Sequence, residues 1–404
     1  MTGMPCWYGV ALLAAATLSR APVQAADWPQ FRGPRGDGIC TETGWTDRFG
    51  PEGPPVTWQK QVGIGYAAVS VADGRLLTAG WADGRTTVHC LDARTGASHW
   101  DFAYAVTRHD KQHVGGPAAT PAIGDGRVYT LSREGELFCL DLRRGDRLWS
   151  KNLAAECRAQ KPSFGFTGSP VVYGDVVYVD VGPLVALDRA SGELRWQSKD
   201  YGSAYSTPVP FTARGRSLIA AFPRFGLVVI EAATGQTWAD HAWENIWGNN
   251  AATPIVAGDR IFVSSGDDPG GIYLEVGQRT LSEVWRNGQM RTQMATCVQI
   301  DGHLYGFDEA VLKCLRLGDG QVQWKQRGLG RGTLLAGDGK LVVLSEDGEL
   351  VIADATSDRF RVRSRAQVLD ADRCWTVPVL ADGRLYCRSS QGQLVCLDLR
   401  PPEP

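Results

Sequence analysis

The sequence has little of what marks a catalytic, metal-binding or nucleic-acid-binding protein. It has 6 histidines and 4 methionines in 404 residues, and 42 Lys and Arg residues nearly balance 44 Asp and Glu residues. A net charge of −2 provides no basic surface to attract nucleic acid or anionic lipid. There is no Gly-x-Ser-x-Gly, no His-Glu-x-x-His and no paired-cysteine zinc spacing. The apolar run from Trp7 to Leu18 is too short to span a membrane, so we expect no transmembrane segment.

Two short motifs resemble binding sites but lie in the wrong context. The glycine run from Gly63 to Ala68 mimics a dinucleotide-binding loop, yet it precedes a strand instead of opening a helix. His109 and His113 are four residues apart, which would create a metal site only on a helix. Their loop between two repeats favours exposure to solvent, and we expect no bound metal there.

Glycine and tryptophan are abundant, with 48 and 14 residues, and both recur in one repeated phrase. The clearest copy runs from Cys139 to Trp149: a strand ends at Asp141, a turn contains Gly145, and a second strand carries the tryptophan. Aspartate accepts hydrogen bonds from the turn backbone, and glycine supplies positive φ. A repeat of roughly 40–50 residues indicates a propeller or a solenoid. Further copies begin at Cys90, Ala186, Val229, Cys314, Ile352 and Cys396; the copy at Ile352 has Val362 at the tryptophan position, and the last copy ends before its tryptophan.

Each repeat predicts a four-stranded antiparallel meander, because short runs joined by glycine turns precede the phrase. The eighth repeat has only three strands, and Pro55–Lys60, with Trp58, supplies a fourth from the other end of the chain. We therefore predict a single all-β, eight-bladed β-propeller whose last blade is closed by the N-terminal strand, which leaves no open sheet edge. The first strands of the repeats begin near Tyr66, Thr120, Ser169, Thr207, Thr253, Thr296, Thr333 and Val377. The tryptophans expected to dock each blade on the next are Trp58, Trp100, Trp149, Trp196, Trp238, Trp285 and Trp324.

The chain is expected to divide into four segments. Residues 1–25 have the pattern of a signal peptide, since an apolar run precedes the small-residue cleavage site Val23-Gln24-Ala25. Residues 26–53, rich in glycine and proline, predict an extended strap laid on the ring and anchored by Trp28 and Phe31. The propeller follows over 54–400, and 401–404 form a tail. No Leu-x-Gly-Cys lipidation box is present, so we expect a soluble monomer that is periplasmic or secreted.

The cysteines have two interpretations. Signal cleavage would leave nine of the ten, an odd number that requires a free thiol or an intermolecular bond. Cys90, Cys139, Cys314 and Cys396 share the small-residue position of the repeat, which predicts buried packing. If Gln391-Gly392 forms a hairpin turn, Cys387 lies opposite Cys396, and a cross-strand disulfide is then an alternative to two free thiols.

The loops that lead into the innermost strands predict a binding funnel at one mouth of the ring. Aromatic rings, amides and three arginines gather there when the repeats are aligned. This composition suits a planar anionic molecule or a carboxylate-bearing peptide. Polar loops whose aromatics simply pack between blades are the alternative. The funnel residues are Tyr66, His113, Phe166, Tyr205, Trp247, Asn249, Asn250, Arg291, Arg331, Arg373 and Trp375.

The phrase small-x-Asp-x-x-Thr-Gly-x-x-x-Trp resembles the tryptophan-docking repeat of quinoprotein (pyrroloquinoline quinone, PQQ) dehydrogenases. It also resembles the propeller lipoprotein of the outer-membrane β-barrel assembly (BAM) machine. The resemblance covers Trp58 to Leu399. Because it also contains the segments Trp28–Gly38, Phe164–Pro170 and Cys374–Pro378, the chain is similar to a family of exported PQQ-like repeat propellers. The docking motif implies the fold and says little about function, because it acts at blade interfaces.

Two functions follow from the resemblance. The first is a non-enzymatic exported scaffold that binds a protein, peptide or small anionic ligand at the funnel and needs no cofactor; the short loops favour it. The second is a dehydrogenase that uses PQQ and calcium to oxidise alcohols or sugars. The adjacent cysteine pair of many quinoprotein alcohol dehydrogenases is missing here, and we predict the first function. The oxygens that could hold calcium in the second belong to Glu244, Asn249, Asn250, Asp370 and Asp372.

Overall fold

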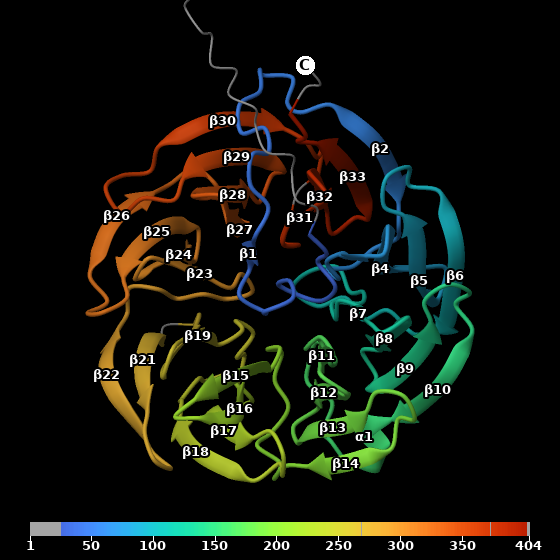
Figure 1. Ribbon diagram of the computed structural model, residues 1–404, viewed down its shortest axis with the longest axis vertical. Helices are drawn as coiled ribbons and strands as arrows, with labels where there is room; N and C mark the ends of the chain where they lie inside the picture. The colour runs from blue at the N-terminus through green and yellow to red at the C-terminus, as the bar shows by residue number, and fades with distance from the viewer. Residues whose placement is uncertain (1–25, 268, 372, 402–404) are drawn as a thin grey trace, which may run out of the picture.

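The computed structural model describes residues 26–267, 269–371 and 373–401, which form eight sheets arranged in a ring (Figure 1). Each sheet is a blade, with its first strand nearest the central axis. The prediction of an all-β, eight-bladed propeller is confirmed. The predicted signal peptide, residues 1–25, lies outside the described residues. Within these ranges no helix has the length and apolarity needed to cross a membrane.

The strands are short and lie in chain order from the axis outward. From the inner to the outer strand, blade 1 contains β3 (Ser70–Ala72), β4 (Arg75–Ala82), β5 (Arg85–Asp92) and β6 (Ser98–Ala105); blade 2 contains β7 (Ala122–Gly124), β8 (Arg127–Leu131), β9 (Glu136–Asp141) and β10 (Arg147–Asn152), followed by α1 (Leu153–Glu156); blade 3 contains β11 (Val171–Tyr173), β12 (Val176–Asp180), β13 (Leu184–Asp188) and β14 (Leu194–Gln197); and blade 4 contains β15 (Val209–Ala213), β16 (Arg216–Ala221), β17 (Gly226–Glu231) and β18 (Thr237–Ala242).

The second half of the ring repeats this order, except that the outer strand of blade 8 is β2, from the N-terminal part of the chain. Blade 5 contains β19 (Ile255–Ala257), β20 (Arg260–Ser265), β21 (Gly270–Val276) and β22 (Leu281–Asn287); blade 6 contains β23 (Val298–Ile300), β24 (His303–Asp308), β25 (Val311–Arg316) and β26 (Val322–Gln326); blade 7 contains β27 (Thr333–Gly337), β28 (Lys340–Leu344), β29 (Glu349–Asp354) and β30 (Val362–Gln367); and blade 8 contains β31 (Val379–Ala381), β32 (Arg384–Arg388), β33 (Gln393–Asp398) and β2 (Val56–Gln61).

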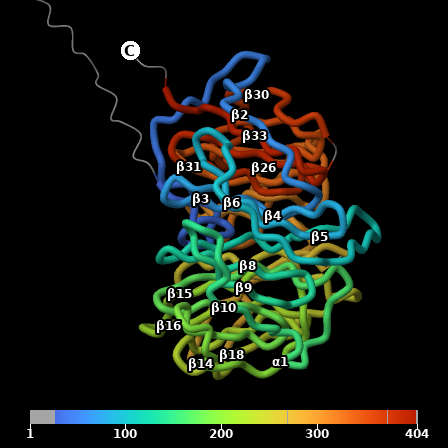
Figure 2. Tube along the Cα trace, turned by 90° about the vertical axis from the view of Figure 1, so that its right-hand side faces the viewer, coloured from blue at the N-terminus to red at the C-terminus, as the bar shows by residue number. Residues whose placement is uncertain are grey.

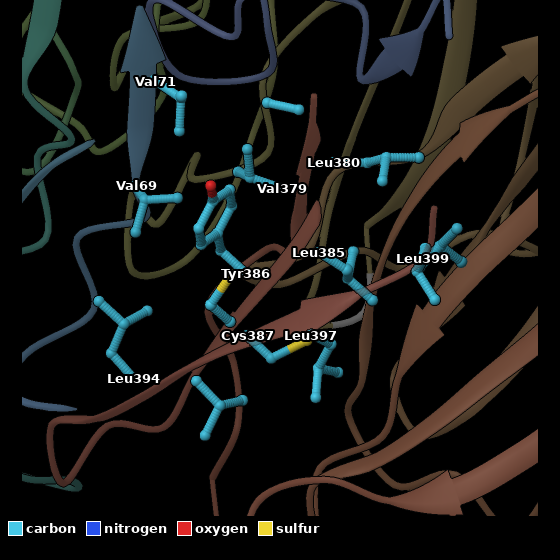
Figure 3. Close-up of a cluster of buried hydrophobic side chains, with 14 of the residues drawn as sticks. Val69, Val71, Val379, Leu380, Leu385, Tyr386, Cys387, Leu394, Leu397 and Leu399 are labelled. Atoms are coloured by element: carbon cyan, nitrogen blue, oxygen red, sulfur yellow. The ribbon is translucent and has the colours of Figure 1, made fainter. Parts of the chain in front are cut away.

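The ring is closed within blade 8. Strand β2, from the N-terminal part of the chain, pairs antiparallel with β33 near the C-terminus, with Trp58 opposite Cys396. This confirms the predicted closure. Figure 2 views the ring from its edge, and Figure 3 shows Val69 and Val71 of blade 1 close to Tyr386 of blade 8 in one apolar cluster.

A buried arginine reinforces the same junction. The Arg388 side chain is 1% exposed and donates to backbone carbonyl oxygens of blade 1 and of the segment that leads into it. Its Nη1 donates to Ala67 and Ala79, and its Nη2 donates to Gly63. These bonds join blades 8 and 1 in addition to the β2–β33 pairing.

Each docking tryptophan donates its indole N–H to a carbonyl of the next blade at 2.7–3.1 Å. At five of these seven contacts the motif glycine of that blade lies under the ring, and a Cβ on Gly145, for example, would lie 2.6 Å from Cδ2 of Trp100. This glycine therefore meets a packing requirement as well as its φ of 76°. The donors Trp58, Trp100, Trp149, Trp196, Trp238, Trp285 and Trp324 bond, in that order, to Ala93, Leu142, Ala190, Ala232, Gly277, Leu317 and Thr356.

The junction between blades 7 and 8 has no docking tryptophan, and the position assigned from the sequence was wrong. Ser364, not Val362, lies opposite Ile352, because the preceding turn is longer than in the other repeats. The strap replaces the missing side chain. Trp45 is buried there, and the backbone N–H of Thr46 donates to Leu399 at 2.6 Å, as a docking indole would.

The cysteines are free and mostly buried among the described residues. The register of β32 and β33 places Cys387 opposite Val395 and Tyr386 opposite Cys396. Because side chains alternate along a strand, Cys387 and Cys396 point to opposite faces of the sheet. The expected geometry for a cross-strand disulfide was therefore wrong by one residue, since Gln393 pairs back to Ser389 across a three-residue turn.

The strap crosses the face of the ring opposite the lead-in loops, meaning the loops that join an outer strand to the next inner strand. Trp28 bridges to Val71 of β3 and is buried, whereas Phe31 is half-buried. Strand β1 (Ile39–Cys40) adds to β27 in parallel, which the sequence did not predict. Figure 1 shows this segment in blue across the middle of the ring. The guanidinium of Arg32 extends to the carbonyl of Cys297 at 2.7 Å, so the strap ties distant blades together.

Candidate binding funnel

Five rings from five consecutive lead-in loops form a continuous series, which we call the aromatic arc. It consists of Trp375, Tyr66, His113, Phe164 and Tyr205, from the loops into blades 8, 1, 2, 3 and 4. Successive ring centroids lie 6.0, 5.3, 5.0 and 5.7 Å apart. Four of these residues were predicted for the funnel. The arc covers about half of the mouth with half-buried aromatic surface.

Backbone and hydroxyl contacts hold the lead-in loops in place. The backbone N–H of Tyr66 donates to Pro117, and the backbone N–H of Tyr205 donates to Asn250, each in the next lead-in loop. Nearer the inner strands, the Ser169 hydroxyl accepts from the N–H of Thr120, and the Thr207 hydroxyl accepts from Ser169. The aromatic arc therefore stands on a rigid wall, which favours a pre-formed site.

Phe164 was missed and Phe166 was misplaced by the sequence alignment. Phe166 is 1% exposed and packs in the core between blades 2 and 3. Phe164 takes the arc position instead: its ring stacks on His113 at an interplanar angle of 19° and meets Tyr205 edge to face. The lead-in loop of blade 3 is long and contains a bend at Gly165, with φ of 80°, so alignment on the inner turn could not give its side-chain directions.

Two cations lie close to the aromatic arc. Lys111 Nζ lies 5.8 Å from the Phe164 ring centroid, a cation–π distance. Burial lowers the pKa of His113, and the nearby charge of Arg373 lowers it further, while Asp110 raises it. His113 is therefore neutral near pH 7, and Arg373 and Lys111 provide the positive charge of this half.

A small recess lies beside the arc at the loops into blades 6 and 7, and in this region carboxylates hold two of the three predicted arginines. Arg331 Nη2 donates to Glu309 at 3.1 Å, and its backbone N–H donates to Glu346. Glu346 also accepts the indole N–H of Trp375, which couples the recess to the aromatic arc. Arg291 is held by buried Asp308, which also pairs with Lys313. The recess is lined by Gln293, Met294, Ala295, Phe307, Glu309, Arg331, Gly332, Thr333 and Trp375.

The remaining predicted residues lie on the loop into blade 5 and are not in ring contact with the aromatic arc in the described structure. Trp247 is 68% exposed and Asn249 is half-buried. Asn250 is fully buried and donates its amide to the carbonyl of Pro223 at 2.7 Å. It therefore positions a loop and offers little to a ligand.

The candidate calcium ligands do not fit a calcium–PQQ site. Glu244 and Asp370 are exposed on lead-in loops of different blades, whereas Asn250 is fully buried, with Nδ2 bonded to Pro223 and Oδ1 unpartnered among the described residues. Asp372 lies outside the described residues. Across the described parts of the chain, no three His, Cys, Asp or Glu side chains gather as metal ligands. His109 and His113 lie on a non-helical loop, with His109 exposed and His113 in the aromatic arc.

The fold and the repeat define an eight-bladed propeller of tryptophan-docked blades. The sequence profile of the family described as outer membrane protein assembly factor BamB matches residues 42–287 and 301–400. The chain belongs to this family of PQQ-like repeat propellers, as the resemblance implied. It is 26% identical over 292 residues to the outer membrane protein assembly factor BamB of Escherichia coli (strain K12), covering 68% of this chain and 72% of that protein.

Dehydrogenases are also among the relatives, with less of their length covered. The quinohemoprotein alcohol dehydrogenase ADH-IIG of Pseudomonas putida is 27% identical over 263 residues, which is 57% of this chain and 35% of that enzyme. The solved structure of BamB from Moraxella catarrhalis superposes with a TM-score of 0.61 at 16% identity, covering 86% of this chain and 99% of that one. The solved ADHIIG structure of Pseudomonas putida HK5 gives 0.63 at 14% identity over 94% and 82%. These superpositions show that the three chains share one fold.

Proposed function

We propose that this chain is an exported, non-enzymatic scaffold that binds a protein or peptide partner, or a small anionic ligand, through the funnel. The aromatic arc carries the proposal: five half-buried rings from five blades offer apolar surface with fixed geometry, and Lys111 and Arg373 add positive charge. Rigid aromatic surface ringed by polar groups is typical of binding hot spots. A carboxylate seated near Arg373 would gain a charge-assisted hydrogen bond.

The relatives support a binding role in an exported protein. The family and several relatives are named as outer membrane assembly factors, which favours a periplasmic or secreted location and a protein partner. We propose that the chain is a monomer, because the ring leaves no unpaired blade edge at its seam. The dehydrogenase alternative has sequence relatives, but Glu244 and Asp370 are exposed on loops of different blades and belong to no cluster of three acidic, His or Cys side chains in the described residues, which favours the scaffold.

The proposal is tested by titrating the protein with a short peptide that carries aromatic side chains and a free C-terminal carboxylate. Binding is measured by calorimetry and by tryptophan fluorescence. Trp375→Ala and Phe164→Ala should each weaken binding at least ~10-fold, since a buried aromatic contact contributes about 2 kcal/mol or more at a hot spot. Arg373→Ala should weaken binding less than the aromatic variants do. Its effect should be larger at low salt than at high salt. Tyr173→Ala is the matched control, because Tyr173 is half-exposed at the end of β11, on the other face of the ring.

Equal affinity in the aromatic variants and the control would move the binding site away from the funnel. PQQ with calcium is titrated in parallel. Saturable binding together with dye-linked alcohol oxidation would overturn the non-enzymatic function.

A further inference from the structure

The side chain of Glu42 is a fully buried carboxylate held only by backbone donors. It is 0% exposed. Oε1 accepts the N–H of Ala26 at 2.9 Å and that of Asp382, while Oε2 accepts the N–H of Gly383 at 2.8 Å. No Lys, Arg or His side chain in the described residues forms an ion pair with it. A buried carboxylate without a counter-ion is costly, so this arrangement calls for a positive charge.

One of these three donors becomes a cation if the signal peptide is removed at its predicted site. Cleavage after Ala25 turns the backbone nitrogen of Ala26 from a neutral amide into an α-amino group, which is charged below its ordinary pKa of about 8. The other two donors are peptide N–H groups inside the chain and stay neutral. We propose that Glu42 is the counter-ion of the mature N-terminus, and that cleavage thereby creates a partly buried ion pair that holds the strap in place.

The position of this pair explains what it would stabilise. Ala26 and Glu42 are the two ends of the loop that crosses the ring, with Trp28 on blade 1 and β1 on blade 7 between them. Asp382 and Gly383 form the first turn of blade 8. A charge-assisted bond at 2.9 Å would therefore connect the strap to blade 8 and close the strap on itself. In an uncut chain the donor is a neutral amide, so the same contact is a hydrogen bond to the carboxylate without an ion pair, and it is weaker.

The charges around the pair favour an ammonium at this point. Asp27 is next in sequence, and its pKa is raised by burial and by the negative charge of Asp73. Burial raises the pKa of the Cys40 thiol, and the negative charges of Glu42 and Asp338 add to the rise, while a backbone hydrogen bond and Arg35 oppose it. Of the nearby arginines, Arg384 pairs with Asp382 and Arg35 pairs with Asp37. The local balance is acidic, so the α-amino pKa in the folded protein should exceed its unfolded value.

This inference rests on the predicted export and goes beyond funnel binding, so the two can fail separately. The first measurement is the intact mass of the protein recovered after export. A mature chain that begins at Ala26 is expected, and a different first residue would overturn the proposal whether or not the funnel binds a ligand.

The second measurement is a thermodynamic cycle on the mature chain, with a free or an acetylated N-terminus and with Glu42 or Glu42→Gln. Acetylation should lower the melting temperature by about 2–4 °C when Glu42 is present. It should have little effect in the Glu42→Gln protein. If acetylation lowers the melting temperature equally in the Glu42 and Glu42→Gln proteins, the proposed pair is refuted. Glu52→Gln is the matched control, because Glu52 is exposed in the same segment.

The pH dependence has a defined sign. A folded α-amino pKa above about 8 means that the stabilisation is complete below the unfolded pKa and is lost as the pH rises through the folded pKa. The difference between free and acetylated chains should therefore shrink above pH 8. If Glu42→Gln does not fold, a different measurement tests the pair. The rate at which the N-terminus of the folded protein reacts with an amine reagent is measured as a function of pH, which gives the α-amino pKa. An α-amino pKa above 8 supports the pair, and an ordinary value overturns it.

Discussion

At the residue scale, the ring contains buried charges that are held in different ways. Burial lowers the pKa of Arg388 to about 9, yet its guanidinium has three carbonyl acceptors and the hydroxyl of Thr78. Burial raises the pKa of Asp180 to about 7, the charge of Asp200 adds to the rise, and the N–H of Gly182 opposes it. Hydrogen bonds therefore offset the cost of burying the charge of Arg388, whereas the cost of burying Asp180 in its ionised form is poorly offset.

This difference predicts a pH effect on stability. A folded pKa near 7, against about 4 in the unfolded chain, means that the folded state binds the extra proton between these values, so stability falls as the pH rises from 4 to 7. Asp180→Asn mimics the protonated acid. It should be neutral near pH 4 and stabilise the protein by about 1–4 kcal/mol at pH 8. Urea melts at both pH values test this.

Asp240→Asn serves as the control, since Asp240 is exposed on β18 and should show no such contrast. If Asp180→Asn has the same effect at pH 4 and pH 8, the carboxyl is not titrating in this range.

At the scale of the elements, the sequence predicted the blades well because each repeat specifies them locally. A tight turn between the first two strands and a tryptophan on the outer strand recur; in blade 2 the first turn is Asp125-Gly126, and both residues have positive φ, as a tight hairpin turn requires. The loops were less predictable. Their lengths vary, so Phe166 was aligned with the funnel although Phe164 occupies it, and Trp45 could not be assigned to the blade 7–8 junction without knowing where the strap lies.

The docking element makes a prediction that separates backbone strain from packing. Gly145 and Gly126 have similar φ values of 76° and 70°. A Cβ on Gly126 would meet nothing within 4 Å, whereas on Gly145 it would lie 2.6 Å from the Trp100 ring. Gly126→Ala should cost about 1–2 kcal/mol from strain alone. Gly145→Ala should cost about 1–3 kcal/mol more, because the indole must move.

Chemical denaturation of the two variants gives the comparison, and tryptophan fluorescence reports on the docked ring. If both variants lose the same free energy of unfolding, the indole moves without cost, and the motif glycine is needed only for the backbone conformation of the turn.

At the scale of the whole molecule, both ends of the propeller meet in one blade. Blades 1 to 7 each take their four antiparallel strands from one continuous segment, and blade 7 gains the remote strand β1 in addition; blade 8 alone draws one of its four antiparallel strands from the other end of the chain. The chain then uses three further contacts near that closure: Arg388 across blades 8 and 1, Thr46 on Leu399, and Glu42 on the first turn of blade 8. The strap and β2 act as one N-terminal clasp on the ring.

The clasp predicts that removing β2 should destabilise the entire ring and not one blade alone. Deleting residues 54–60 leaves β33 with an unpaired edge and removes Trp58 from its contact with Ala93. The melting temperature should fall sharply. A synthetic peptide of residues 54–60 added in trans should restore part of the loss, because β2 holds blade 8 by non-covalent pairing. The same peptide with Trp58→Ala should restore less, since it pairs without docking on blade 1. An unchanged melt after the deletion would show that blade 8 closes without its fourth strand.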